Sequence, residues 1–419
     1  MSGTDGEVGG GWLGIEAVRD ARAAGAGLVR HTPVLSSRSL SDAAGGSVVL
    51  KAENLQRTGS FKLRGALARL HHHLPAAGVV AGSAGNHGQS LAYAARAHGV
   101  PCEVFMPGDA AVAKVAAVRG FGGTVHDGGA SVDACVDQAR AHAERTGAVF
   151  VHPFDDPRVV AGQGTLALEL LEDVGDLATV IVPVGGGGLI SGVAGVLAEL
   201  APRARVVGVQ VDACAPFPAS LRDGRVAEAA STATIADGIA IKRPGGMTLP
   251  LVQRWVDEVV TVSEGEVAEA MVLLMERAKL VVEGAGAVGV AALTSGAVRP
   301  ARDGSTVVVL SGGNVDAGLL AGIANRHETE AGRRLRLFTR VADRPGGLAA
   351  LLAAVAEAGG NLRTLEHVRD AVPLAVRDTG VELVMDTRGV EHSTRIVAAL
   401  EEAGYEVTVH GGAGIGATA

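Results

Sequence analysis

Lys62 is the first residue whose surroundings point to chemistry. It follows the small polar run Thr58-Gly59-Ser60 and then Phe61, just where a helix-forming pattern begins. A lysine on a helix is usually a solvated surface charge, and that is the alternative here. In a partly desolvated pocket, however, a neutral lysine amine can bond to an aldehyde as a Schiff base. Evidence for one of these two interpretations comes from the residues in the other turns of the sequence.

Four consecutive glycines, Gly185 to Gly188, follow an apolar strand pattern and precede Leu189 and an apolar helical run. Successive glycine N–H groups can converge on an anion, and a helix N-terminus adds the positive end of its dipole. The run has neither the lysine of a P-loop nor the G-x-G-x-x-G spacing of a dinucleotide site. A flexible turn is the alternative, but the position favours a cradle for a single phosphate.

Two further polar turns follow predicted strands. In "GSAGNHGQS" (82–90), free N–H groups could hold a carboxylate, or Ser83 or Asn86 could cap a helix. The candidate substrate-binding residues of this turn are Ser83, Ala84, Gly85, Asn86 and His87. "LSGGN" (310–314) offers the Ser311 hydroxyl. A phosphate cradle, a carboxylate cradle and a poised lysine together indicate pyridoxal 5'-phosphate as cofactor.

The elements around these turns indicate an α/β fold. Short apolar runs alternate with helical patterns from about residue 79 to residue 322. Continuous apolar strands that alternate with helices are typical of a parallel sheet covered on both faces. Ligands of such sheets bind beyond the carboxyl ends of the strands, which is where the three turns lie.

A different pattern begins after the charged stretch 325–333, which we interpret as a linker. Residues 334–412 show a strand, a helix, two strands, a helix and a last strand, a βαββαβ arrangement. The sequence therefore predicts a catalytic domain over residues 1–324 and a small C-terminal module.

Composition argues against several classes of protein. A net charge of −8 over 419 residues is unlike that of a general nucleic-acid binder. The three cysteines are far apart in the sequence, which fits a reducing cytoplasm. The histidines at 71–73 would point in different directions on a helix, so we expect no metal site. No apolar run has membrane-spanning length, and residues 1–14 look like a loose leader rather than a signal peptide.

The chain resembles the serine/threonine dehydratase family of pyridoxal-phosphate enzymes, which have the tryptophan-synthase-β fold, or fold type II. The matching segments follow the family's order over nearly the whole first 320 residues. They are "ENLQRTGSFKLRGA" (53–66), "SAGNHGQ" (83–89), "GQGTLALEL" (162–170), "GGGGL" (185–189), "TATIADG" (232–238), "EGAGA" (283–287) and "SGGN" (311–314). The resemblance implies two doubly wound parallel-sheet subdomains, the small one spanning roughly residues 55–154.

The resemblance also implies roles in cofactor binding. Lys62 is similar to the Schiff-base lysine, Phe61 to the residue that packs against the pyridine ring, and Asn86 to the one that hydrogen-bonds the cofactor hydroxyl. The residues that correspond to the phosphate loop are Gly185, Gly186, Gly187, Gly188 and Leu189. Ser311 corresponds to the partner of the pyridine nitrogen. A neutral serine there leaves that nitrogen largely unprotonated, which favours prompt β-elimination.

Two further candidates lie near the expected cofactor, Gly238 and Glu283. Glu283 could equally be a structural carboxylate that caps the following helix. Asp237, in the turn "IADG", is expected to be structural.

The same resemblance implies elimination of water from L-threonine, and from L-serine, giving 2-oxobutanoate or pyruvate with ammonia. Lys62 would remove the α-proton. Serine racemase is the closest alternative, but Ala84 stands where racemases have a proton-donating serine. In addition, Gln210, Cys214 and Pro216 stand where racemases have a divalent-metal site. The preference among threonine, serine and bulkier substrates stays open. The non-enzyme alternative is an amino-acid sensor with a degenerate active site.

The C-terminal module resembles an ACT domain through "VADRPGGLAALLAAVAEAGGNL" (341–362). That resemblance implies allosteric control by a small amino acid such as isoleucine or valine, with Asn361 as the candidate effector-binding residue. It also implies a homodimer or homotetramer. A packing module without a ligand is the alternative, because a fold does not fix a function.

Overall fold

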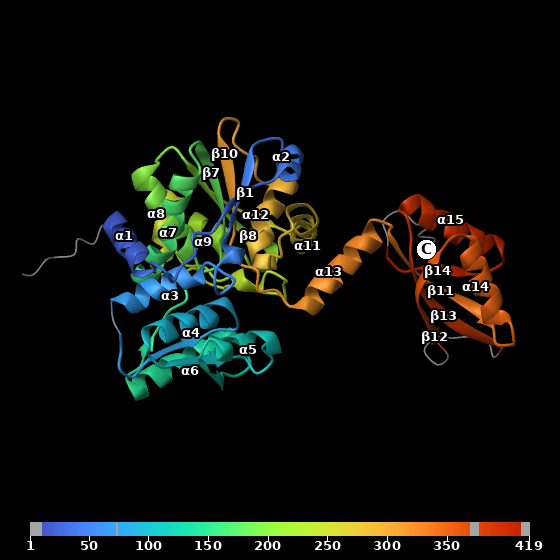
Figure 1. The fold of residues 1–419 in the computed structure, drawn as a ribbon, viewed down its shortest axis with the longest axis horizontal. Helices are drawn as coiled ribbons and strands as arrows, with labels where there is room; N and C mark the ends of the chain where they lie inside the picture. Colours follow the sequence, from blue (N-terminus) through green and yellow to red (C-terminus); the bar gives the residue numbers. More distant parts are fainter. Residues whose placement is uncertain (1–10, 73, 369–376, 412–419) are drawn as a thin grey trace, which may run out of the picture. The chain divides into compact units, whose positions relative to one another are not determined.

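The computed structural model describes residues 11–72, 74–368 and 377–411 (Figure 1). Two compact units make up the chain, Met1–Asp316 and Ala317–Ala419, so the division falls before the boundary expected at residue 324. Most of the expected leader and the last of the three consecutive histidines lie outside the described residues. Among the residues described, no helix is long and apolar enough to cross a membrane.

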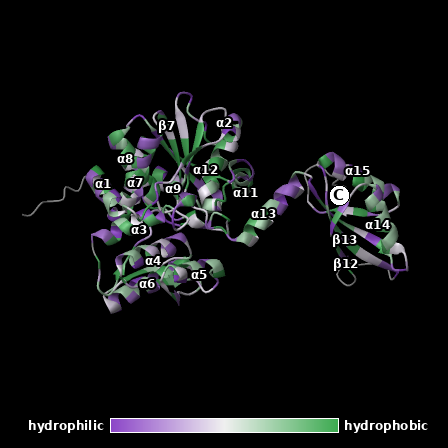
Figure 2. Ribbon diagram, in the orientation of Figure 1, coloured by the Kyte–Doolittle hydropathy of each residue, from purple (hydrophilic) through white to green (hydrophobic). Residues whose placement is uncertain are grey.

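A six-stranded sheet in the order β1-β2-β10-β7-β8-β9 forms the centre of the first unit. The edge strand β1 is antiparallel to β2, and all the other neighbours are parallel. The strands are β1 (Val34–Ser36), β2 (Val48–Ala52), β7 (Leu177–Pro183), β8 (Arg205–Val211), β9 (Glu258–Val262) and β10 (Ser305–Leu310). Every residue of β10 is buried, and the hydropathy colouring of Figure 2 shows the apolar character of the sheet's centre. Burial on both faces is why these strands are continuously apolar.

Helices cover both faces of this sheet (Figure 1). On one face lie α1 (Gly14–Ala24), α7 (Pro157–Asp173), α8 (Gly188–Leu200), α9 (Pro216–Asp223) and α10 (Thr248–Trp255). On the other lie α2 (Arg38–Ala44), α11 (Glu264–Leu273) and α12 (Gly284–Thr294). Short 3-10 turns cover Glu53–Leu55, Asp212–Cys214 and Asp237–Ile239, and a π-helical turn covers Leu274–Ala278.

A second, four-stranded parallel sheet has the order β5-β4-β3-β6. Its strands are β3 (Val79–Gly82), β4 (Cys102–Met106), β5 (Thr124–Asp127) and β6 (Val149–Phe150). Its helices are α4 (Asn86–His98), α5 (Val112–Gly120) and α6 (Val132–Thr146), while α3 (Lys62–His71) packs against both α4 and α7. The two parallel sheets with their helices confirm the predicted fold class.

Side chains at the helix starts explain several boundaries. Ser131 Oγ accepts the N–H of Ala134 at 3.2 Å at the start of α6. The Asp156 carboxylate accepts the N–H groups of residues 158 and 159 at 2.8 and 3.2 Å, and a proline occupies the first turn of α7. A capping box of Ser263 and Glu266 starts α11. Each arrangement satisfies N–H groups that the helix leaves without partners.

The second unit contains an antiparallel sheet in the order β12-β13-β11-β14. Its elements are α13 (Ala317–Glu330), β11 (Arg334–Ala342), α14 (Gly347–Glu357), β12 (Asn361–Val368), β13 (Asp378–Asp386), α15 (Val390–Glu402) and β14 (Val407–Val409). From β11 onwards this is the predicted βαββαβ order. Most of the stretch 325–333, expected to be a linker, is helical, because α13 continues to Glu330. Arg326 and Glu330 form an i,i+4 ion pair at 2.8 Å, which supports a helix with few apolar residues.

Candidate active site

Several loops meet at the carboxyl ends of the parallel strands of the first unit. They are residues 53–62 after β2, 83–87 after β3, 151–155 after β6, 184–189 after β7 and 311–314 after β10. Two contacts show how closely they approach one another. The Phe61 N–H donates to the Ser311 carbonyl oxygen at 3.1 Å, and Phe154 lies directly against Gly186. The strand ends therefore form one site, as expected for parallel sheets.

Lys62 is the first residue of α3, and its side chain is half-buried. Its Nζ donates to the Pro153 carbonyl oxygen at 2.8 Å and lies 5.2 Å from the centre of the Phe61 ring. Burial lowers the pKa of Lys62 from 10.5 to about 8, while the Glu283 carboxylate acts in the opposite direction. The amine thus loses its proton far more readily than that of a surface lysine, as a nucleophile or base requires.

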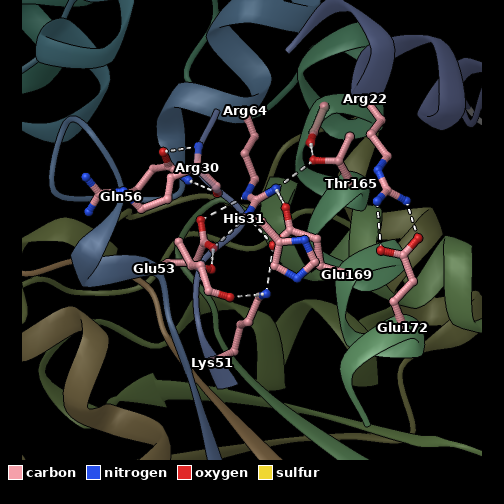
Figure 3. Close-up of polar contacts among 12 residues, drawn as sticks. Arg22, Arg30, His31, Lys51, Glu53, Gln56, Arg64, Thr165, Glu169 and Glu172 are labelled. Carbon is pink, nitrogen blue, oxygen red and sulfur yellow. Dashed lines mark hydrogen bonds and ion pairs between the residues drawn. The ribbon is translucent and has the colours of Figure 1, made fainter. Parts of the chain in front are cut away.

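A buried ion network holds the helix that carries Lys62 (Figure 3). Arg64, two residues further along α3, pairs with Glu53 at 2.8 Å and with Glu169 of α7 at 2.7 Å. Lys51 of β2 contacts the same Glu169 at 2.7 Å. The network ties α3 to the large sheet and to α7, so it fixes the start of α3 relative to the strand ends. Buried charges need such mutual pairing, because desolvation is costly.

The glycine loop of residues 185–189 can accept an anion. Gly187 is the N-cap residue of α8, and as a glycine it has no side chain that could cap the helix. Within the described part of the chain, none of the five backbone N–H groups of this loop donates a hydrogen bond. Free N–H groups at a helix N-terminus are a phosphate-binding arrangement.

Close packing explains why this loop consists of glycine. Gly187 has a φ of 97°, a left-handed conformation that favours glycine. A Cβ on Gly186 would lie 2.4 Å from ring atoms of Phe154, and one on Gly188 would lie 2.9 Å from the Cβ of the same residue. Segment 151–155 therefore contacts both the glycine loop, through Phe154, and Lys62, through Pro153.

The loop of residues 83–87 offers donors of a different kind. Ser83 Oγ accepts the N–H groups of Gly85 and Gly88 at 3.2 and 3.1 Å, but the N-cap residue of α4 is Gly85 and not Ser83 or Asn86. Among the described residues, the backbone N–H groups of Ala84, Asn86 and His87 have no partner. The two bonds to Ser83 thus leave a set of N–H groups that could bind a carboxylate.

His87 is uncharged in this loop. Burial and the charge of Lys62 lower its pKa to about 3. Its Nε2 lies 2.9 Å from the Val151 carbonyl oxygen, which can only accept, so Nε2 carries the proton of the neutral ring. His87 therefore supplies no positive charge to a substrate carboxylate.

Side-chain hydrogen bonds connect the start of α4, which packs on the smaller sheet, to loops of the larger sheet. Asn86 Nδ2 donates to Glu283 Oε1 at 2.7 Å, and Asn314 Nδ2 donates to Asn86 Oδ1 at 2.7 Å. Burial and, after it, the Asp237 carboxylate raise the pKa of Glu283 to about 7, although the bond from Asn86 acts against this. Glu283 is the N-cap residue of α12, but its side chain makes no capping bond. It faces the site instead, contrary to the capping alternative.

Ser311 and Gly238 complete the predicted set. Ser311 is buried directly after β10, where its backbone accepts from Phe61. A Cβ on Gly238 would lie 3.7 Å from Glu283 Oε1, and one on Gly185 would lie 3.6 Å from the Gly238 carbonyl oxygen. Gly238 therefore lies between the glycine loop and Glu283.

Three residues outside the predicted set also belong to this region. Asn314 bridges Asn86 and the Thr58 carbonyl oxygen, the latter at 2.9 Å. Lys114 Nζ of α5 lies 2.5 Å from Asp237 Oδ2, so the carboxylate of this turn residue pairs with a lysine of another element. The "SGGN" motif could have suggested Asn314. Nothing local in the sequence around Lys114 predicts its contact.

Two of the positions compared with racemases, Ala84 and Gln210, have a methyl and an amide side chain. Ala84 offers no side-chain proton donor. The buried Gln210 donates from Nε2 to the Val184 carbonyl oxygen at 3.1 Å and accepts from the Phe217 N–H at 3.0 Å. Its amide thus links the end of β8 to the residue before the glycine loop. In the second unit, Asn361 is exposed at the start of β12, 3.4 Å from Asp386.

The residues at the site fit pyridoxal phosphate. The free N–H groups of residues 185–189 match its phosphate, and the low-pKa amine of Lys62 matches its aldehyde. The buried Ser60 hydroxyl, next to Phe61, has no partner among the described residues. Ser311 is a neutral hydroxyl suited to a ring nitrogen.

Comparisons with known proteins agree with this fit. Residues 26–312 match the family described as pyridoxal-phosphate dependent enzyme. The L-threonine ammonia-lyase of Thermotoga maritima is 43% identical over 400 residues, which are 95% of this chain and 99% of that protein. A crystal structure of threonine deaminase from T.th. has 41% identity and a TM-score of 0.68, covering 72% of this chain and 99% of its own. Maize serine racemase has 35% identity and a TM-score of 0.70, covering 75% and 97%.

Proposed function

The chain belongs to the family of pyridoxal-phosphate dependent enzymes, and from this premise we propose that it is a lyase that deaminates L-threonine, and also L-serine. The observation that carries the proposal is the position of Lys62. Its low-pKa amine contacts segment 151–155, which also packs on the anion-binding glycine loop. The L-threonine ammonia-lyase of Thermotoga maritima, similar over nearly the whole chain, supports the choice of substrate.

When bound, pyridoxal phosphate supplies an electron sink for bond cleavage at the substrate's α-carbon. The residues that would hold it are Lys62, Phe61, Asn86, the loop 185–189 and Ser311. Ser311 contributes no charge to the ring nitrogen, which favours prompt elimination over other fates of the substrate. The loop 83–87 would bind the substrate carboxylate through its free N–H groups.

Lys62 is the proposed general base. Its amine, which is neutral at pH values above its pKa of about 8, takes the α-proton. The Pro153 carbonyl oxygen holds Nζ in place. The β-hydroxyl leaves as water, and hydrolysis then returns one water and releases ammonia. The net products are 2-oxobutanoate and ammonia from L-threonine, and pyruvate and ammonia from L-serine.

Racemisation is the second candidate, because maize serine racemase shares the fold. Moving a proton to the opposite face of the substrate would need a donor there, and Ala84 provides none. A sensor without activity fits less well, since Lys62, Ser311 and the glycine loop are all in place. We also propose that the C-terminal unit is an ACT-like module that binds a small amino acid and that the protein is a homo-oligomer.

The test is 2-oxo-acid formation from L-threonine by protein loaded with pyridoxal phosphate, with Lys62→Ala as control. We expect rapid formation of 2-oxobutanoate by the wild type and none above background in the variant. A yellow, cofactor-loaded wild-type protein that forms no 2-oxo acid would refute the assignment. Racemisation of L-serine would then be measured.

A further inference from the structure

The loop proposed to bind the substrate carboxylate contains only neutral donors. The N–H groups of Ala84, Asn86 and His87 are free among the described residues, and the His87 ring is uncharged. An amino-acid carboxylate has a full negative charge, and hydrogen bonds from a charged donor are roughly twice as strong as neutral ones. A cation beside this loop would therefore add substantially to substrate affinity.

Lys114 provides such a cation. Its side chain is 19% exposed, and a Cβ built on Gly85 would lie 3.9 Å from both Cδ and Nζ of Lys114. The ammonium group thus lies over the middle of loop 83–87, although α5 is far from this loop in the sequence. The present partner of Lys114 Nζ is the Asp237 carboxylate, 2.5 Å away, and the Asp237 side chain is 56% exposed. Ion pairs with such an exposed partner contribute little net stability and can be exchanged readily.

We propose that Lys114 is a substrate-binding residue whose ammonium group exchanges the Asp237 carboxylate for the carboxylate of an amino acid held at loop 83–87. The inference rests on the proposed function, since it extends the same site. Asp237 acts as a competing anion that positions Lys114 in the absence of substrate. The pair also joins the small subdomain to residues 237–241, which lie against Gly185.

The chain offers a matched control for a purely structural role. Lys242, on the same segment as Asp237, pairs with Asp133 of α6 at 3.7 Å and so makes a second ion pair between the two subdomains. Both side chains of that pair are largely exposed, at 49% and 77%. Lys114→Met and Lys242→Met each remove one lysine from the links between the same two parts. Only the first removes a charge beside loop 83–87.

The experiment measures the dissociation constant of L-alanine from the cofactor-loaded protein by the change in cofactor absorbance. L-Alanine lacks a β-leaving group, so binding does not depend on elimination. We expect Lys114→Met to raise this constant roughly tenfold to a hundredfold, since a charge-assisted bond is lost. Lys242→Met should leave it within about twofold. L-Alaninol, which has no carboxylate, should bind the wild type and Lys114→Met equally.

Two accompanying results sharpen the test. Asp237→Asn should lower the constant for L-alanine, because the competing carboxylate is gone, and Lys114→Arg should largely restore binding. Equal loss in Lys114→Met and Lys242→Met, or no loss in the former, would overturn the proposal, as would a wild type that does not bind L-alanine. If L-threonine gives no 2-oxo acid but L-alanine binding still depends on Lys114, only the proposed reaction fails.

Discussion

The amine of Lys62 is held in surroundings that disfavour its charge. Burial lowers its pKa to about 8, from 10.5 for an ordinary lysine. Only the neutral amine reacts with an aldehyde, so uptake of pyridoxal phosphate by the cofactor-free protein should accelerate about tenfold per pH unit below pH 8 and then level off. Stopped-flow absorbance measures this rate, with Lys62→Ala as the blank. A rate that still rises steeply at pH 10 would contradict the lowered pKa.

Glu283 is perturbed in the opposite sense, with its pKa raised to about 7. The folded protein therefore holds a proton that the unfolded chain releases near pH 4.5, so this carboxyl lowers stability as the pH rises from 4.5 to 7. Glu283→Gln should match the wild type in melting temperature at pH 4.5 and melt higher at pH 7.5. Thermal melts of the cofactor-free proteins at both pH values measure the difference. A constant offset across this range would be inconsistent with the prediction.

The roles of some single residues could be predicted from the sequence, and those of others could not. Lys62, Ser311 and the four glycines lie in motifs whose spacing and position after strands indicate their chemistry. Lys114 lies in an unremarkable helical pattern, and its importance comes from the distant Gly85 and Asp237 that the fold brings to it. Such contacts are set by tertiary packing, which local patterns do not encode.

Helix α3 depends on charges buried beneath it. Arg64→Met would leave Glu53 and Glu169 without their guanidinium partner, and an unpaired buried charge costs about 3–5 kcal/mol. Arg22→Met removes an arginine of the same neighbourhood that is paired with Glu172 at the surface and should cost at most about 1 kcal/mol (Figure 3). Urea unfolding of both variants gives the comparison. Equal losses would show that the buried network is not what secures α3.

Elements with strong periodicity or a clear cap could be predicted, and polar ones could not. The apolar runs of β7 and β10 identify themselves as buried strands. The end of α13 has few apolar residues and resembles a linker, yet it is helical because Arg326 and Glu330 pair along it. A pattern based on hydrophobicity does not detect a helix that is stabilised by charge pairs.

At the scale of the molecule, alternation of strands and helices sufficed to predict a parallel sheet covered on both faces and a C-terminal βαββαβ unit, whereas the division into two sheets was implied only by the family resemblance. What it could not supply is which strand ends face one another. The meeting of loops 83–87, 185–189 and 311–314 follows from the strand orders β5-β4-β3-β6 and β1-β2-β10-β7-β8-β9. Those orders depend on non-local pairing, for which a single sequence carries little direct signal.

The proposed effector site and the proposed active site lie in different units, so the two can be tested separately. If the C-terminal unit binds an amino-acid effector near Asn361, L-isoleucine or L-valine should change the rate of 2-oxobutanoate formation by the full-length protein. Asn361→Ala removes polar groups at the start of β12 and should raise the half-effective concentration at least about tenfold. The rate without effector should stay unchanged, because Asn361 lies outside the catalytic unit. Asn325→Ala, an exposed asparagine of α13, serves as the control and should respond like the wild type. An unaltered response in Asn361→Ala would place the effector elsewhere, and a wild type insensitive to both amino acids would identify the unit as a packing module.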